Sequence, residues 1–181
     1  MTMKEIRLHG RGGLGVVKAS QLVVRAAVEG GLYGQSIPAF GVERKGSPVF
    51  GYLRLSHTPI RRRMQVYTPD ILLILDDSLI TSPDTYAGLK DGGMIIINTK
   101  KAVEDLHVPK ETGTVVTVDA TTISEELLGR NMPNTAMLGA FTAATGLVDM
   151  ERLLQDIAQT FGTINRTAAE KAAASIQIHR L

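Results

Sequence analysis

Alternation of apolar and polar positions predicts a strand at the start of the chain and a buried helix after it. In residues 4–9 (KEIRLH), Ile6 and Leu8 fall on one face of an extended chain. The run from Leu14 to Val28 has good helix formers and few polar positions, and Gly30 follows it. Strand, glycine turn and helix make the first half of an α/β unit.

Short apolar runs predict the other strands, of the kind found in sheets that are covered on both faces. They occupy residues 33–37, 49–55, 70–75, 94–98 and 114–118. We expect a helix over residues 78–90 that starts or breaks near Pro83, a capping box at Thr122 and Glu125, and Asp149 as the N-cap of a helix over residues 150–161. The pattern predicts a three-layer α/β domain with a mostly parallel, helix-covered sheet.

Length and composition fit one domain over residues 1–181 without disulfides. The chain has 181 residues, 44% of them hydrophobic, and no cysteine. It therefore has no thiolate for an iron-sulfur cluster or for nucleophilic catalysis. No secretory signal or run of about 18 apolar residues is present, so we expect a cytoplasmic protein without a membrane segment.

Charge is nearly balanced, at a net +2, which does not indicate a general nucleic-acid coat. Its distribution is uneven, because residues 42–66 carry six arginines and lysines against Glu43 alone, a local net charge of +5. An acidic partner or a phosphate ligand would meet this segment. For Arg61, Arg62 and Arg63 taken alone, a solvated basic loop is the favoured interpretation.

The glycine-rich turn after the first predicted strand is a candidate anion site. The run HGRGGLG, residues 9–15, contains G-x-G-x-x-G between a strand and a helix, where free N–H groups and the helix dipole attract a phosphate. A tight turn with no ligand is an equally good interpretation. The dinucleotide version needs an acidic residue about 20 positions onward, at the end of the second strand, and none is there. Candidate contacts are Gly10, Arg11, Gly12, Gly13 and Gly15.

Other chemistries find little support. Val16 and Val17 follow Gly15 where a Walker loop has lysine and serine or threonine, and there is no G-x-S-x-G elbow. The four histidines show no metal-ligand spacing, so we expect no metal site. Asp76 and Asp77 follow a strand, and capping of the next helix is favoured over a catalytic role. We expect no catalytic residue in this chain.

Three segments together resemble one family. They are residues 10–17 (GRGGLGVV), 38–49 (PAFGVERKGSPV) and 134–140 (NTAMLGA). They resemble the gamma subunit, or gamma domain, of the 2-oxoacid:ferredoxin oxidoreductases, of which pyruvate:ferredoxin oxidoreductase is the best known. We expect the match to extend to about Phe161.

The resemblance implies a subunit of a complex that converts a 2-oxoacid, pyruvate in first place, and coenzyme A to acyl-CoA, CO₂ and reduced ferredoxin. Thiamine diphosphate and iron-sulfur clusters would lie on alpha, beta and delta-type partner subunits, coenzyme A would be the co-substrate, and this chain would bind no cofactor alone. Partners would be those subunits and, through them, ferredoxin or a similar acceptor, with no nucleic acid and no membrane.

The resemblance also adds to the candidate site. Glu43, Arg44 and Lys45, before Gly46, would face coenzyme A or another subunit, against an alternative of local ion pairs in an exposed loop. Asn134 is most simply a helix N-cap, and a ligand contact is the second interpretation. A stand-alone dinucleotide-binding protein of Rossmann type remains the alternative function.

Overall fold

A seven-stranded mixed sheet organises the chain, in the order β2-β3-β1-β4-β5-β6-β7. The computed structural model describes residues 2–39 and 46–181. Its strands are β1 (Lys4–Arg11), β2 (Tyr33–Pro38), β3 (Pro48–Ser56), β4 (Ile71–Ile74), β5 (Met94–Asn98), β6 (Thr114–Val118) and β7 (Gln177–Arg180). Strands β1, β4, β5 and β6 are parallel neighbours, whereas β3 pairs antiparallel with β1 and β2, and β7 antiparallel with β6.

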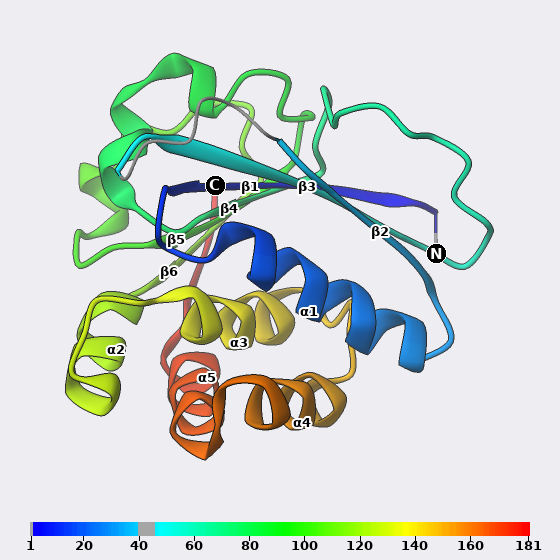
Figure 1. Cartoon of the computed structure of the whole chain (residues 1–181). Coiled ribbons are helices and arrows are strands. Elements are labelled where there is room, and N and C mark those ends of the chain that lie inside the picture. Colours follow the sequence, from blue (N-terminus) through cyan, green and yellow to red (C-terminus); the bar gives the residue numbers. More distant parts are fainter. Residues whose placement is uncertain (1, 40–45) are drawn as a thin grey trace.

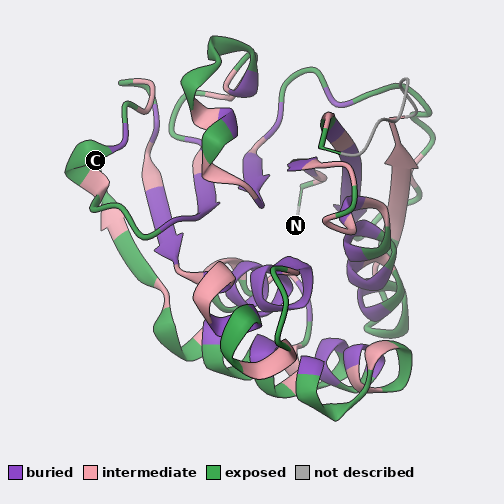
Figure 2. Ribbon diagram, turned by 60° about the vertical axis from the view of Figure 1, so that its left-hand side comes forward, coloured by how far each residue is buried: buried purple, intermediate pink, exposed green. Residues whose placement is uncertain are grey.

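The α-helices of the described residues all lie on one face of this sheet, below it in Figure 1. They are α1 (Val16–Glu29), α2 (Ala120–Leu128), α3 (Asn134–Thr145), α4 (Met150–Phe161) and α5 (Thr163–Ser175). Helix α3 is buried along most of its length between the sheet and α5, whereas the outer sides of α1, α2, α4 and α5 are exposed (Figure 2). Strand residues such as Leu8, Leu53 and Val116 join the helices in the larger apolar cluster.

The opposite face is covered by 3-10 helices and loops. These are η1 (Asp77–Thr81), η2 (Pro83–Thr85) and η3 (Val103–Asp105). Leu72, Ile74 and Ile95 pack there with Ile80 and Tyr86 in a second apolar cluster. The α/β class and the largely parallel sheet are thus confirmed, and the third layer consists of short turns.

Three local predictions are corrected. The helix expected over residues 78–90 is replaced by η1 and η2, because Pro83 lacks the N–H needed to continue a helix from η1. Helix α2 begins earlier than the Thr122 capping box, since Asp119 accepts from the backbone N–H of Thr122 at 3.0 Å. Asn134 is not an N-cap, because Pro133 holds that position of α3. The prediction of Asp149 as the N-cap of α4 is confirmed, as its carboxylate accepts from the N–H of Arg152.

Strand β2 lies at the edge of the sheet, separated from β1 by the antiparallel β3. In a dinucleotide-binding fold the second strand is the parallel neighbour of the first, so that its carboxyl end presents an acidic residue to the ribose. Here β2 ends at Pro38 on an outer edge. The topology therefore separates this fold from the Rossmann arrangement. No helix in the described part of the chain is long and apolar enough to cross a membrane.

Candidate functional site

The glycine loop joins the end of β1 to the start of α1 through two left-handed residues. Gly13 has φ 98° and Gly15 has φ 75°, and Gly15 is the N-cap of α1. A side chain is strained at such angles, so glycine is required by the backbone itself. The backbone N–H groups of Gly13, Gly15 and Val16 have no hydrogen-bond partner within the described residues. The start of α1 thus carries backbone N–H donors that no described residue satisfies.

The loop is also a close crossing point of three elements. A methyl group on Gly15 would lie 2.5 Å from the Nδ2 atom of Asn134, at the start of α3. One on Gly10 would lie 2.5 Å from the Cγ2 atom of Val16. The N-termini of α1 and α3 therefore meet beside the carboxyl end of β1, where both helix dipoles favour an anion.

Arg11 fastens the loop to its neighbours. Its guanidinium donates to the carboxylate of Asp76 at 3.0 Å, to the Oγ of Ser78 at 2.6 Å and to the carbonyl of Gly46 at 3.0 Å. The Gly12 N–H donates to the carbonyl of Ser47, and the Gly46 N–H to the carbonyl of Gly12. Residues 46 and 47, which directly follow the charged run Glu43, Arg44 and Lys45 in the sequence, therefore pair with the glycine loop.

The structure brings together most of the residues that the sequence singles out. Gly10, Arg11, Gly12, Gly13, Gly15, Gly46 and Asn134 lie at one end of the sheet. Glu43, Arg44 and Lys45 lie outside the described residues. Asn134 is only 3% exposed, and its side-chain oxygen accepts from the N–H of Thr135.

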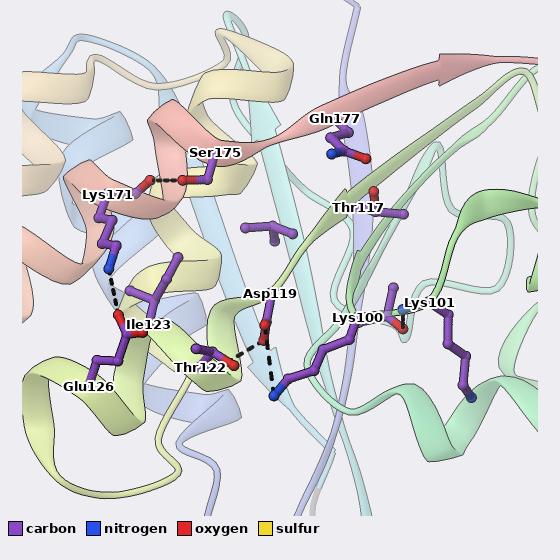
Figure 3. A pocket seen from close by; sticks show the side chains of 12 residues that line it. Lys100, Lys101, Thr117, Asp119, Thr122, Ile123, Glu126, Lys171, Ser175 and Gln177 are labelled. Atoms are coloured by element: carbon purple, nitrogen blue, oxygen red, sulfur yellow. Dashed lines mark hydrogen bonds and ion pairs between the residues drawn. The ribbon is translucent and has the colours of Figure 1, made fainter.

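Two neighbouring hollows continue this site along the carboxyl ends of β4, β5 and β6. The first, of about 350 Å³, runs from Leu14 past Asp77 to Thr121. The second, of about 450 Å³, lies between β6, α2 and α5 (Figure 3). Both are lined by Thr99, Lys100, Lys101 and Asp119, so together they form one groove. Ligands of open α/β sheets bind at this edge.

Acidic groups of the chain itself neutralise the lysines of the groove. Lys100 lies 3.9 Å from Asp119, Lys101 lies 3.4 Å from Asp77, and Lys171 lies 2.6 Å from Glu126. These lysines are exposed, so each ion pair contributes little to stability. Asp76 accepts from the N–H of Ser78 and caps η1, as the sequence predicts.

Asn98 holds the strand ends in register, and sequence reasoning missed it. Its side chain donates to the carbonyl of Leu75 at 2.9 Å and to the Oγ1 of Thr121 at 2.8 Å, and it accepts from the N–H of Thr121. One buried amide therefore links the end of β5 to the residue after β4 and to the first turn of α2. The sequence did carry a signal for this position, since polar residues come directly at the end of an apolar run. Lys100 and Lys101 share this signal.

His9 lies buried on the face opposite the helices, one residue before the glycine loop. Its Nε2 accepts from the guanidinium of Arg7 at 2.8 Å, and Arg7 also donates to the carbonyls of Thr85 and Ala87. Burial, and then the charge of Arg7, lower the pKa of His9 from 6.5 to about 3. The imidazole is therefore neutral and structural. The described residues contain no group of three or more potential metal-ligating side chains.

Comparison with known proteins finds a consistent set of relatives. The family model "Pyruvate ferredoxin/flavodoxin oxidoreductase" matches residues 5–177, so the match extends well past Phe161. The pyruvate/ketoisovalerate oxidoreductases common subunit gamma of Thermococcus kodakarensis is 45% identical over 99% of this chain and 100% of its own. Pyruvate synthase subunit PorC of Methanothermobacter thermautotrophicus is 46% identical over 94% of this chain and 92% of its own. The crystal structure of pyruvate oxidoreductase subunit PORC of Thermotoga maritima has a TM-score of 0.87 and 33% identity, covering 99% of this chain and 100% of that one.

Proposed function

The chain belongs to the pyruvate ferredoxin/flavodoxin oxidoreductase family, as a gamma subunit of a 2-oxoacid oxidoreductase complex, and we propose that its complex uses pyruvate as the principal 2-oxoacid. The reaction releases CO₂, transfers the acyl group to coenzyme A and delivers two electrons to ferredoxin. The observation that carries this proposal is the identity of 45% to a pyruvate and ketoisovalerate gamma subunit across 99% of the chain.

Redox chemistry belongs to the partner subunits in this proposal. The chain contains no cysteine, so it cannot hold an iron-sulfur cluster through thiolates. Thiamine diphosphate and the clusters reside on alpha, beta and delta-type subunits. The gamma subunit contributes an interaction surface and helps to position coenzyme A.

Coenzyme A is the ligand that we assign to the glycine-loop end of the sheet. Its phosphates suit the free N–H groups at Gly13, Gly15 and Val16, where the N-termini of α1 and α3 meet. Arg44 and Lys45 precede Gly46, which pairs with Gly12, and supply the positive charge. Arg11 is committed to Asp76 and Ser78, so it holds the loop in shape and leaves the ligand contact to the backbone.

Purification of the complex from its host through a tag on this chain tests the subunit assignment and its substrate. Iron and thiamine diphosphate are expected to copurify on other chains, with pyruvate giving the highest kcat/KM among pyruvate, 2-oxoglutarate, branched and aryl 2-oxoacids. A tagged chain that is recovered alone and binds NAD or FAD would instead establish the stand-alone dinucleotide-binding alternative. Preference for another 2-oxoacid would correct only the substrate.

Variants of the same complex test the coenzyme assignment. Arg44→Ala and Lys45→Ala are expected to raise the KM for coenzyme A while sparing the KM for the 2-oxoacid, because only the phosphate contact is lost. Arg152→Ala is the matched control, since Arg152 is an exposed cation in the first turn of α4 and lines neither hollow of the groove. Equal effects of the three changes on both KM values would leave only a general charge effect.

A further inference from the structure

Segment 57–69 is an irregular stretch that the proposed function leaves without a role. It links β3 to β4 with no helix or strand for 13 residues, from 57 to 69. In Figure 1 it is the teal segment that leaves the end of β3, and it lies on the side of the sheet away from α1–α5. Structureless connections of about this length are uncommon in compact domains and are usually functional or disordered.

A buried arginine holds the middle of the segment in place. Arg54 of β3 is 2% exposed and donates to the carbonyl of Met64 at 2.7 Å and to that of Gln65 at 3.1 Å. Its charge is balanced by Glu5 of β1, at 2.8 Å. The next residue of the segment, Val66, is only 1% exposed. The segment is thus held mainly through its backbone carbonyls, and among its exposed side chains Arg62 adds an ion pair with Glu5 at 4.0 Å.

The end of the segment is also fixed. The Lys90 N–H donates to the carbonyl of Pro69 at 3.1 Å, and the Asp70 N–H to the carbonyl of Glu5 at 2.8 Å. A buried ion pair is a poor source of stability, because desolvation offsets its Coulomb energy. We therefore explain the Arg54–Glu5 pair by the conformation that it imposes on this segment, and not by a contribution to stability.

The side chains displayed by this arrangement are of the kind that bind proteins. Arg61, Arg62 and Arg63 are exposed, as are Met64 (59%) and Tyr67 (66%). Segment 57–69 contains three arginines and no acidic residue, a net charge of +3. Arginine, tyrosine and methionine are enriched at protein interfaces, and tyrosine and arginine carry much of the binding energy there. A preordered loop also avoids the entropy cost of ordering on binding.

We infer that these five side chains, the Arg61–Tyr67 surface, dock this chain onto an acidic and partly apolar surface of another protein subunit of the same complex. The arginines face carboxylates of the partner, whereas Met64 and Tyr67 insert into its apolar part. The inference rests on the proposed function, because it requires a complex. It adds an interface on the face away from the helices and distinct from the glycine-loop end.

Removal of the outward side chains from the complex tests the surface directly. The Arg61→Ala/Arg62→Ala/Arg63→Ala variant is expected to lower the yield of complex recovered through a tag on this chain roughly ten-fold at low ionic strength, and less at high ionic strength. The Met64→Ala/Tyr67→Ala variant should lower it at both. Because Arg54 binds backbone carbonyls, both variants keep those hydrogen bonds, whereas the triple variant also removes the ion pair between Arg62 and Glu5 at 4.0 Å. Unchanged melting of the chain verifies that the segment keeps its place.

The control replaces three exposed cations elsewhere, Lys110→Ala/Arg130→Ala/Arg152→Ala, with the same change in charge. Its yield of complex should stay within two-fold of the parent. Amide hydrogen exchange of residues 57–69 should also be slower in the holo-complex than in the free chain.

Three results would overturn the docking surface. These are equal losses in the control, unchanged yields in both surface variants, or equal exchange of residues 57–69 in the free chain and the complex. Binding of the surface to RNA or to anionic lipid vesicles, with normal assembly, would overturn it too. In these cases the complex still forms and the proposed function stands, whereas failure of the parent chain to copurify with any partner would remove the proposed function itself.

Discussion

Replacement of Gly15 by alanine is the sharpest probe of the candidate site. Gly15 combines two constraints, a left-handed backbone at φ 75° and a neighbour, Asn134 Nδ2, that lies 2.5 Å from the position of an added methyl group. Gly13 has φ 98° but no atom within 4 Å of that position, so it shares only the first constraint. The two glycines therefore separate backbone strain from crowding.

The expected losses differ accordingly. Alanine at Gly13 should lower the free energy of unfolding by about 1 kcal/mol, the cost of a left-handed non-glycine residue. Alanine at Gly15 adds crowding against a side chain that is 3% exposed and starts a helix, worth about 1–3 kcal/mol more. In a chain of this size about 1 kcal/mol lowers Tm by roughly 2–4 °C.

Urea and thermal unfolding of the chain measure both variants, and a double-mutant cycle identifies the cause. Asn134→Ala removes the crowding atom, so Gly15→Ala should cost only about 1 kcal/mol in that background. The coupling between Gly15 and Asn134 then equals the crowding, about 1–3 kcal/mol. Equal losses for Gly13→Ala and Gly15→Ala, or additive losses in the cycle, would refute the close crossing of α1 and α3 at this loop.

Two further predictions concern buried charge and titration. Removal of the Arg54 charge by Arg54→Met should lower the free energy of unfolding by about 3–5 kcal/mol, because buried Glu5 is left with only the exposed Arg62, at 4.0 Å, as a charged partner. The double variant Arg54→Met/Glu5→Gln should cost less in the same urea titration, and a single variant as stable as the parent would contradict this. His9 binds its proton more weakly when folded, with a pKa of about 3 against 6.5, so the unfolded chain holds more protons between those values and stability should fall as pH drops from 6.5 to 3. His9→Gln should reduce that slope by up to about 1.4 kcal/mol per pH unit, and an unchanged slope would show that His9 titrates normally.

Most strands could be predicted because their apolar runs are short and bounded by turn residues. The ranges 94–98 and 114–118 match β5 and β6, and β1 and β3 differ from prediction only at their ends. Such runs are buried on both faces, and their periodicity needs no knowledge of neighbours. β7 was not predicted, since Gln177–Arg180 is polar and becomes a strand only by pairing with β6.

Strand order could not be predicted, because it depends on long-range pairing. No local sequence pattern indicates that β3 lies antiparallel between β1 and β2. This placement is what distinguishes the fold from the Rossmann arrangement. Likewise, residues 78–90 leave room for a helix, but in the structure Asp76 caps a 3-10 turn and Pro83 begins a second one. Tertiary context decides such cases.

The candidate site divides in the same way. The glycines could be predicted, because φ > 0 leaves a signature in sequence. The pairing of Gly12 with Gly46 and the approach of Asn134 to Gly15 join segments distant in sequence, so only the family resemblance connected them beforehand. The roles of Asn98 and of the lysines after β5 depend on the neighbouring ends of β4 and β6, which the sequence alone does not place beside them.

Depletion and return of this chain test the central claim most directly. The complex is purified, the gamma subunit is dissociated from it, and reduction of ferredoxin by pyruvate and coenzyme A is measured before and after the purified chain is added back. We expect no activity from the chain alone, little from the depleted complex, and recovery that saturates when the added chain equals the depleted subunit. Full activity of the depleted complex, or turnover by the chain alone, would contradict its assignment as a non-catalytic gamma subunit.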